Sequence, residues 1–178
     1  MTDSAPDTVI EAAKKIKLLL LDVDGVLTDG RLYYGNSGEE MKAFNIQDGL
    51  GIKLLQKAGV QVGIITGRVS ALLQRRADEL SISPVVQGRE DKLTALNELL
   101  QTMDIAMDEI AFVGDDLPDL AVILRVGLGI TPANGSTTLA KQASWQTNRR
   151  GGDGAVREVA EMILEAQGKL DTLLASYQ

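Results

Sequence analysis

Two aspartates that directly follow a run of leucines are the residues best suited to chemistry. Leu18–Leu21 are all leucine, and Asp22 and Asp24 follow with one residue between them. A short apolar run that ends at turn residues is typical of a buried parallel strand, and ligands bind beyond the carboxyl ends of such strands. The period of two predicts that both carboxylates turn to the same side. Carboxylates this close repel each other, so they require a cation or a shared proton, and oxygen-only ligands suit Mg²⁺.

The pattern of an apolar strand followed by polar residues and glycine occurs twice more. With Lys92, which lies between the two segments, it supplies the candidates Thr66, Gly67, Arg68, Asp115, Asp116 and Asp119. Taken singly, Asp22 is also compatible with a helix cap, Thr66 with a turn and Lys92 with a solvated surface. Three carboxylates within five residues are costly without a cation, so the last segment favours a metal site.

The composition restricts the possible chemistry. The 178 residues include no Cys and no His, which excludes cysteine phosphatases, Ser-His-Asp hydrolases, His-ligated zinc sites and phosphohistidine relays. A net charge of −7 argues against a nucleic-acid partner. No apolar run reaches the length of a membrane span, and the acidic start of the chain lacks the pattern of a signal peptide, so we expect a cytoplasmic protein without membrane association.

Alternating apolar patterns predict one α/β domain over residues 1–178 with a doubly wound parallel sheet. A capping box from Thr8 to Glu11 predicts a short leading helix. Two β-prone arms around Gly35–Gly38 predict a hairpin. Strands are expected at 16–22, 60–65, 84–86, 110–113, 126–130 and 143–146, and helices at 47–58, 70–80, 91–103, 117–124, 136–142 and 154–166.

In their order along the chain, the segments around Asp22, Thr66, Lys92 and Asp115 resemble the four motifs of the haloacid dehalogenase (HAD) superfamily of phosphotransferases. The resemblance implies a Rossmann-like three-layer αβα sandwich. It also implies that Asp22 is a nucleophile that forms an aspartyl-phosphate, and that Asp24 is the general acid and base. Thr66 would donate a hydrogen bond to the phosphoryl group, and Lys92 would neutralise the negative charges of Asp22 and the phosphate.

The same resemblance implies a Mg²⁺ site. The carboxylates of Asp22 and Asp115 and the backbone carbonyl of Asp24 would bind the ion. Asp116 and Asp119 would support these ligands or supply an additional one. Two alternatives use similar parts: a receiver-like signalling domain, in which the phosphorylated aspartate lies on a later strand, and a metal-dependent phosphomutase, which shares the first half-reaction.

Beyond these motifs, residues 20–30, 38–45, 48–52, 64–68 and 152–159 resemble the 3-deoxy-D-manno-octulosonate 8-phosphate (KDO 8-phosphate) phosphatases, a HAD family without a cap domain. The similarity spans about residues 16–170. It implies a homotetramer in which the hairpin, about residues 29–45, covers the active site of a neighbouring subunit. The tail, about residues 167–178, can close over the site in that family.

The family resemblance also suggests a substrate and the residues that bind it. The substrate would be a small sugar-acid phosphate, KDO 8-phosphate of lipopolysaccharide precursor synthesis, with 2-keto-3-deoxynononate 9-phosphate as the alternative. Candidate substrate-binding residues are Lys42, Asn45, Asp48, Gly67 and Arg68. Two segments depart from the family pattern: Asp153 replaces an arginine, and residues 131–136 lack the usual Asp-Ala-His.

Overall fold

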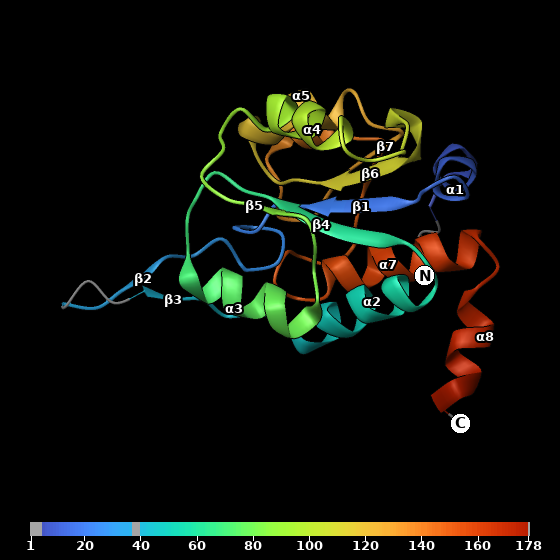
Figure 1. Cartoon of the computed structure of the whole chain (residues 1–178), viewed down its shortest axis with the longest axis horizontal. Helices are drawn as coiled ribbons and strands as arrows, with labels where there is room; N and C mark the ends of the chain where they lie inside the picture. Colours follow the sequence, from blue (N-terminus) through green and yellow to red (C-terminus); the bar gives the residue numbers. More distant parts are fainter. Residues whose placement is uncertain (1–4, 37–39, 178) are drawn as a thin grey trace.

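A six-stranded sheet forms the middle layer of the structure (Figure 1). The structure is a computed structural model that describes residues 5–36 and 40–177. All strand pairs of this sheet are parallel. Across the sheet the strands are β5 (Val85–Val86), β4 (Gln61–Ile65), β1 (Leu18–Leu21), β6 (Ile110–Val113), β7 (Leu128–Thr131) and β8 (Trp145–Gln146). The central position of β1 therefore places Asp22 at the middle of the carboxyl edge.

The four leucines of β1 supply both apolar cores of the molecule. Leu19 and Leu21 belong to the core on one face of the sheet, whereas Leu18 and Leu20 belong to the core on the other. All four are fully buried. Because both faces are covered, the strand is a continuous apolar run and does not alternate with polar residues.

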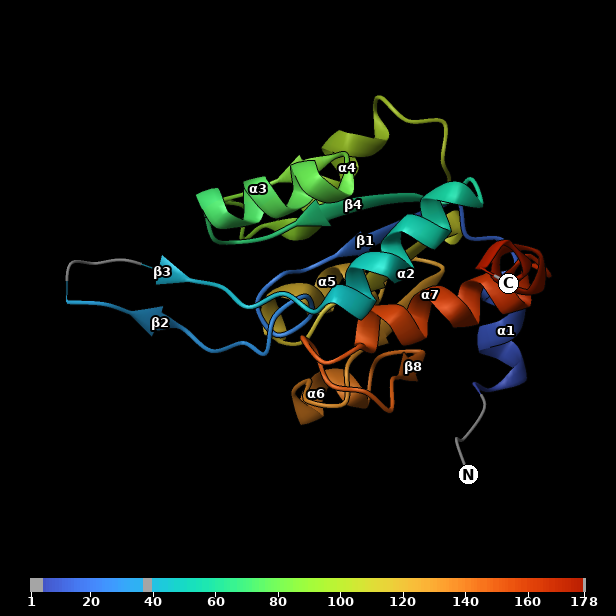
Figure 2. The same ribbon diagram turned by 90° about the horizontal axis from the view of Figure 1, so that it is seen from below.

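Helices cover the two faces of the sheet (Figures 1 and 2). Those packed against the core of Leu19 and Leu21 are α1 (Asp7–Ala13), α2 (Ile46–Lys57), α3 (Ala71–Leu80) and α7 (Ala155–Ala166). Those on the other face are α4 (Lys92–Leu100), α5 (Leu120–Ile123) and α6 (Thr137–Ala140). The expected three-layer αβα sandwich is confirmed. No helix in the described part of the chain is long and apolar enough to cross a membrane.

A β-hairpin projects from the carboxyl edge of the sheet, and residues 5–36 and 40–177 form no cap domain beside it (Figure 2). Its strands β2 (Tyr33–Tyr34) and β3 (Glu40–Met41) pair in antiparallel fashion and form a separate two-stranded sheet. The predicted turn at Gly35–Gly38 lies partly outside the described residues.

One local prediction was wrong, and one predicted helix differs in the type of its first turn. Helix α1 begins at Asp7 after Pro6 and has no side-chain cap, so Thr8 lies inside the helix and does not cap it. Proline with its fixed φ suits the start of a helix without such a cap. The predicted helix at 117–124 is a 3₁₀ turn, Leu117–Asp119, followed by the short helix α5.

The C-terminal tail packs far from the carboxyl edge of the sheet. It forms α8 (Leu170–Leu174) and a final 3₁₀ turn (Ala175–Tyr177), and Lys57 Nζ of α2 lies 3.2 Å from Ser176 Oγ. Figure 1 shows this tail and the hairpin at opposite ends of the molecule. In this conformation the tail does not close over the site of its own subunit.

Candidate active site

Three neighbouring strands deliver polar residues to one place. Asp22 follows β1, Thr66 follows β4 and Asp115 follows β6 after one glycine, and β4 and β6 flank β1 in the sheet. Thr66 is held by its backbone, because its N–H donates to Val86 O and its carbonyl accepts from the N–H of Arg89. The motifs that are separate in the sequence therefore meet at the carboxyl edge, as predicted.

Lys92 is a buried cation beside Asp22. It is the first residue of α4 and only 4% exposed. Its Nζ lies 2.9 Å from Asp22 Oδ1 and 2.5 Å from Asp119 Oδ1. A lysine in the first turn of a helix opposes the helix dipole, so these two carboxylates must hold it there. Burial acts to lower the pKa of Lys92, but Asp22 and Asp119 outweigh burial and raise it, so the amine stays charged.

An acidic triad lies next to this lysine. One carboxylate oxygen of each of Asp22, Asp115 and Asp119 lies within 4.8 Å of the other two. Burial, followed by repulsion from Asp22 and Asp119, raises the pKa of Asp115 to about 7. Burial and Asp22 raise the pKa of Asp119 to about 6, although Lys92 opposes that shift. The triad thus carries an electrostatic penalty that a bound cation would relieve.

Asp119 supports the other acidic residues of its loop. Its Oδ1 pairs with Lys92, and its Oδ2 accepts the backbone N–H of Asp115 at 3.0 Å and that of Asp116 at 3.4 Å. Gly114 permits this arrangement, because a Cβ there would lie 2.4 Å from the Cβ of Asp119. The side chain of Asp116 is exposed and is not a member of the triad.

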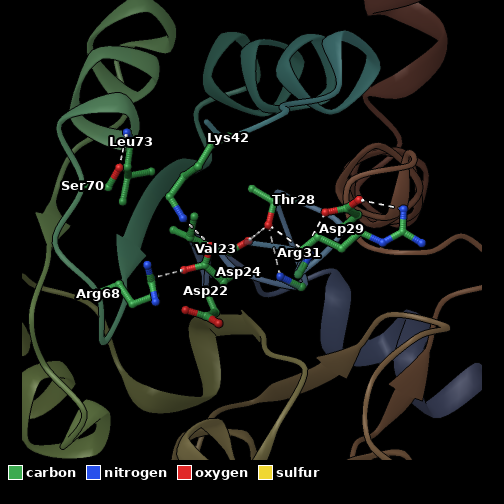
Figure 3. Close-up of polar contacts among 12 residues, drawn as sticks. Asp22, Val23, Asp24, Thr28, Asp29, Arg31, Lys42, Arg68, Ser70 and Leu73 are labelled. Carbon is green, nitrogen blue, oxygen red and sulfur yellow. Dashed lines mark hydrogen bonds and ion pairs between the residues drawn. The ribbon is translucent and has the colours of Figure 1, made fainter. Parts of the chain in front are cut away.

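The side chain of Asp24 points toward Lys42 and Arg68 (Figure 3). Its Oδ1 lies 2.5 Å from Lys42 Nζ, and its Oδ2 lies 3.6 Å from Nε of Arg68. The two carboxylates have different partners, because the strand ends at Leu21 and the chain turns at once: the N–H of Val26 donates to Val23 O. One carboxylate thus faces the triad, and the other faces two cations.

Thr28 closes the loop that carries both aspartates. Its Oγ1 accepts the N–H groups of Gly25 and Gly30 at 3.3 and 3.2 Å and lies 3.4 Å from Val23 O (Figure 3). It is 2% exposed. A small hydroxyl four residues after a site aspartate was the available sign of such a turn.

The remaining candidates lie around the hairpin base. Gly67 and Arg68 follow Thr66 directly, and the Arg68 side chain is 42% exposed. Asn45 caps α2 by accepting the N–H of Gln47.

Asp48 was a candidate substrate-binding residue, but the structure buries its side chain. It is 1% exposed, and its carboxylate accepts the N–H groups of Gly154 at 3.3 Å and Arg157 at 2.8 Å. Burial raises its pKa, and these hydrogen bonds oppose the shift. The structure therefore joins Asp48 to the start of α7 and gives it no exposed surface for a substrate.

Comparison with known proteins agrees with this geometry. Residues 85–159 match the haloacid dehalogenase-like hydrolase family. The chain is 48% identical to the 3-deoxy-D-manno-octulosonate 8-phosphate phosphatase of Yersinia pestis over 165 residues, which cover 93% of this chain and 88% of that protein. The corresponding phosphatase of Escherichia coli K12 is also 48% identical, over 92% and 87% of the two chains.

A solved structure extends the similarity to three dimensions. The Moraxella catarrhalis 3-deoxy-D-manno-octulosonate 8-phosphate phosphatase, determined in complex with magnesium ion, phosphate ion and KDO, superposes with a TM-score of 0.94 at 46% identity and covers 96% of this chain and 98% of that one. Because these matches cover more than nine tenths of this chain, the similarity is not limited to the motifs. The chain belongs to the 3-deoxy-D-manno-octulosonate 8-phosphate phosphatase family of haloacid dehalogenase-like hydrolases.

Proposed function

We propose that this chain is a Mg²⁺-dependent phosphatase that hydrolyses KDO 8-phosphate to KDO and phosphate. The observation that carries the proposal is the buried Lys92, which lies between Asp22 and Asp119 beside a triad of carboxylates. An anionic nucleophile attacks an anionic phosphate ester only where fixed positive charges offset the repulsion. The identity with KDO 8-phosphate phosphatases over most of the chain supports the choice of substrate.

The first half-reaction uses Asp22 and Asp24. An oxygen of Asp22 attacks phosphorus, and the bond from phosphorus to the sugar oxygen breaks. Asp24, in its protonated form, gives its proton to the leaving oxygen. The two carboxylates have different neighbours, since Asp22 faces Lys92 and Asp24 faces Lys42 and Arg68, so the two residues can have different roles. Thr66 donates a hydrogen bond to the phosphoryl oxygens.

The second half-reaction releases phosphate. Asp24, now ionised, removes a proton from a water molecule whose oxygen attacks phosphorus. The bond between phosphorus and Asp22 breaks, so that the nucleophile is regenerated as inorganic phosphate leaves. Splitting the hydrolysis into two steps avoids a direct attack of water on a stable monoester.

The acidic residues fit a magnesium ion. Within the described part of the chain, the Asp115 carboxylate has no hydrogen-bond or ion-pair partner, whereas both oxygens of Asp119 are engaged. Asp22, Asp115 and the backbone carbonyl of Asp24 would therefore hold the ion, and Asp119 would orient Asp115 through its N–H. When bound, Mg²⁺ would offset the charge of the phosphoryl group. The magnesium in the Moraxella catarrhalis structure supports this choice of ion.

A panel of substrates tests the proposed function. Phosphate release from KDO 8-phosphate is compared with release from 2-keto-3-deoxynononate 9-phosphate and from hexose phosphates, with and without Mg²⁺. We expect the highest kcat/KM for KDO 8-phosphate. A preference for the nine-carbon acid would establish the alternative substrate, and no turnover of any ester would refute a phosphatase.

We also propose that the hairpin acts on a neighbouring subunit in a homotetramer. Leu32, Tyr33, Tyr34 and Met41 of the hairpin are between 40 and 68% exposed, and a two-stranded ribbon of this size is only marginally stable alone. Outside the hairpin, Ile46 and Val69 are apolar residues that are 82 and 75% exposed. A second subunit would cover these residues, and the hairpin would shield an otherwise open site.

The raised pKa values of the triad predict a pH-dependent effect of Mg²⁺ on stability. The ordinary aspartate pKa of 3.8 rises to about 7 for Asp115 and about 6 for Asp119 in the folded protein. The stability from these groups is therefore fully present below about pH 4 and is lost as the pH rises through 6 to 7. We expect the Tm of the metal-free protein to fall between pH 5 and pH 8, and Mg²⁺ to raise it most at pH 8, because Mg²⁺ binds the ionised carboxylates.

The Asp115→Asn variant is the control for this measurement by differential scanning calorimetry. It removes the group with the largest shift and should flatten the pH dependence of the metal-free protein. An equal effect of Mg²⁺ at pH 5 and pH 8 would contradict the assignment of the ion to this triad.

The buried position of Asp48 predicts a loss of stability on truncation. The Asp48→Ala variant leaves the N–H groups of Gly154 and Arg157 without their acceptor, which we expect to cost about 1–3 kcal/mol of unfolding free energy. Denaturant unfolding measures this cost, and KM measured below the transition should stay within about twofold of the wild-type value. A large rise in KM at unchanged stability would instead support the prediction that Asp48 contacts the substrate.

A further inference from the structure

Asn134 joins two loops at the carboxyl edge of the sheet. It lies between β7 and α6, in the segment that departs from the family pattern. Its Nδ2 donates to the backbone carbonyl of Gly25 at 3.1 Å, and its Oδ1 accepts the N–H of Gly151 at 2.5 Å. A carbonyl can only accept and an N–H can only donate, so these two partners fix which way the amide points. One side chain thus connects the loop of the site aspartates to the loop before α7.

The Gly25 backbone lies directly against a triad carboxylate. Gly25 has a φ of +94°, and a Cβ there would lie 2.1 Å from Asp115 Oδ2. A Cβ on Gly151 would lie 1.7 Å from Gly25 O. Gly25 therefore has close contacts with both Asp115 and Gly151. Gly25 follows Asp24 directly, so the carbonyl that Asn134 holds is one residue along the chain from the Asp24 carbonyl, and the same glycine lies against the Asp115 carboxylate.

Further hydrogen bonds connect this contact with the hairpin base. The N–H of Gly152 donates to Val26 O at 3.0 Å, and Asn45 Nδ2 donates to Gly152 O at 3.4 Å. Thr28 ties the aspartate loop to itself, whereas Asn134 and Gly152 tie it to the rest of the protein. Asn134 is the side chain in this set that contacts both loops.

We propose that Asn134 is a positioning residue for phosphoryl transfer. It holds the Gly25 peptide, and through this peptide the Asp24 backbone and the Asp115 carboxylate, in the arrangement that the reaction and Mg²⁺ binding need. The inference rests on the proposed function, and Asn134 acts through Gly25 without touching the substrate. A displacement of about 1 Å in such a site costs up to about 10²-fold in rate.

Two variants and a matched control test this role. Asn134→Asp keeps an acceptor for Gly151 but places a carboxylate oxygen against Gly25 O, and Asn134→Ala removes both hydrogen bonds. Gln146→Ala is the control, because Gln146 Nε2 donates to Pro132 O of the same segment at 3.3 Å and has no hydrogen bond to the aspartate loop. We measure kcat and KM for KDO 8-phosphate, the rise in Tm with Mg²⁺, and hydrogen exchange of residues 22–30 without ligand.

We expect the Asn134 variants to lower kcat and to leave KM nearly unchanged. Both Asn134 variants should lower kcat about 10-fold or more with KM within about twofold, reduce the Tm rise with Mg²⁺, and speed exchange at residues 22–30 but not in the strands. Gln146→Ala should change none of these. Wild-type kcat and exchange in both variants, or faster exchange throughout the sheet in step with the loss of kcat, would overturn the proposal. Exchange needs no turnover, so it tests whether Asn134 holds residues 22–30 in place even if the wild-type protein hydrolyses no sugar-acid phosphate.

Discussion

The Asp22→Asn variant is expected to lose phosphatase activity, on the order of 10⁴-fold or more, while its fold and Tm remain close to those of the wild type. The amide has the shape of the carboxylate but is a poor nucleophile, so no aspartyl-phosphate forms. Stability should hold, because Lys92 keeps Asp119 as a partner and the repulsion of Asp22 on Asp115 and Asp119 disappears. Steady-state phosphate release and far-UV circular dichroism measure the two effects.

Asp171→Asn is a matched control for this substitution. Asp171 is exposed in the first turn of α8, at the end of the molecule opposite the hairpin (Figure 1). The same change of chemical group there should leave kcat unaltered. Phosphate release by Asp22→Asn at the wild-type rate would remove Asp22 from the role of nucleophile, and trapping of phosphate on the wild-type protein but not on the variant would support that role directly.

Making the hairpin polar is expected to abolish assembly and most of the activity together. Tyr34 and Met41, 68 and 66% exposed, lie on β2 and β3, which pair only with each other among the described strands. The double variant Tyr34→Ser/Met41→Ser removes apolar surface without touching the core. We expect a monomer with at least about 10-fold lower activity and an unchanged far-UV spectrum, since the site would lose its cover. Light scattering gives the mass, and turnover is measured on the same sample.

The control for the hairpin is Tyr177→Ser. Tyr177 is 63% exposed in the last 3₁₀ turn, far from the hairpin (Figure 1). Its replacement removes a comparable aromatic surface and should leave mass and activity unchanged. If the hairpin double variant were a fully active monomer, the site would function without a second subunit, and the proposed lid would be wrong.

Most of the fold could be predicted because the strands are apolar runs that end at polar residues. The leucines of β1, and the residues that follow β4 and β6, indicated a buried parallel sheet and where its carboxyl edge lies. The local differences from prediction occurred where one short-range preference outweighed another. Pro6 started α1 in place of Thr8, and the segment after Asp116 folded first as a 3₁₀ turn because Asp119 accepts N–H groups from its own loop.

The site residues could be predicted where they belong to a sequence motif, but not where their contacts depend on how the chain folds. The order of the motifs, through its resemblance to the HAD superfamily, indicated that Asp22, Thr66, Lys92 and Asp115 belong to one site. It did not indicate that Asp24 pairs with Lys42 and Arg68, because strand periodicity stops at Leu21. The contacts of Asp48 and Asn134 could not be predicted for another reason. Their partners lie more than 100 residues away in the chain, at Arg157 and Gly25, and no local pattern encodes such contacts.

The two outermost strands of the main sheet are short, which protects the folded chain from aggregation. The outermost strands β5 and β8 each have only two residues, Val85–Val86 and Trp145–Gln146. A sheet grows by adding strands to the unpaired N–H and C=O groups of its outer strands, and a two-residue strand offers too few of them to template a foreign strand. The long apolar strands β1, β4 and β6 are kept inside, paired on both sides. We therefore expect that extending β5 or β8 by several β-branched residues would lower the protein concentration at which the folded chain precipitates, with little change in its Tm.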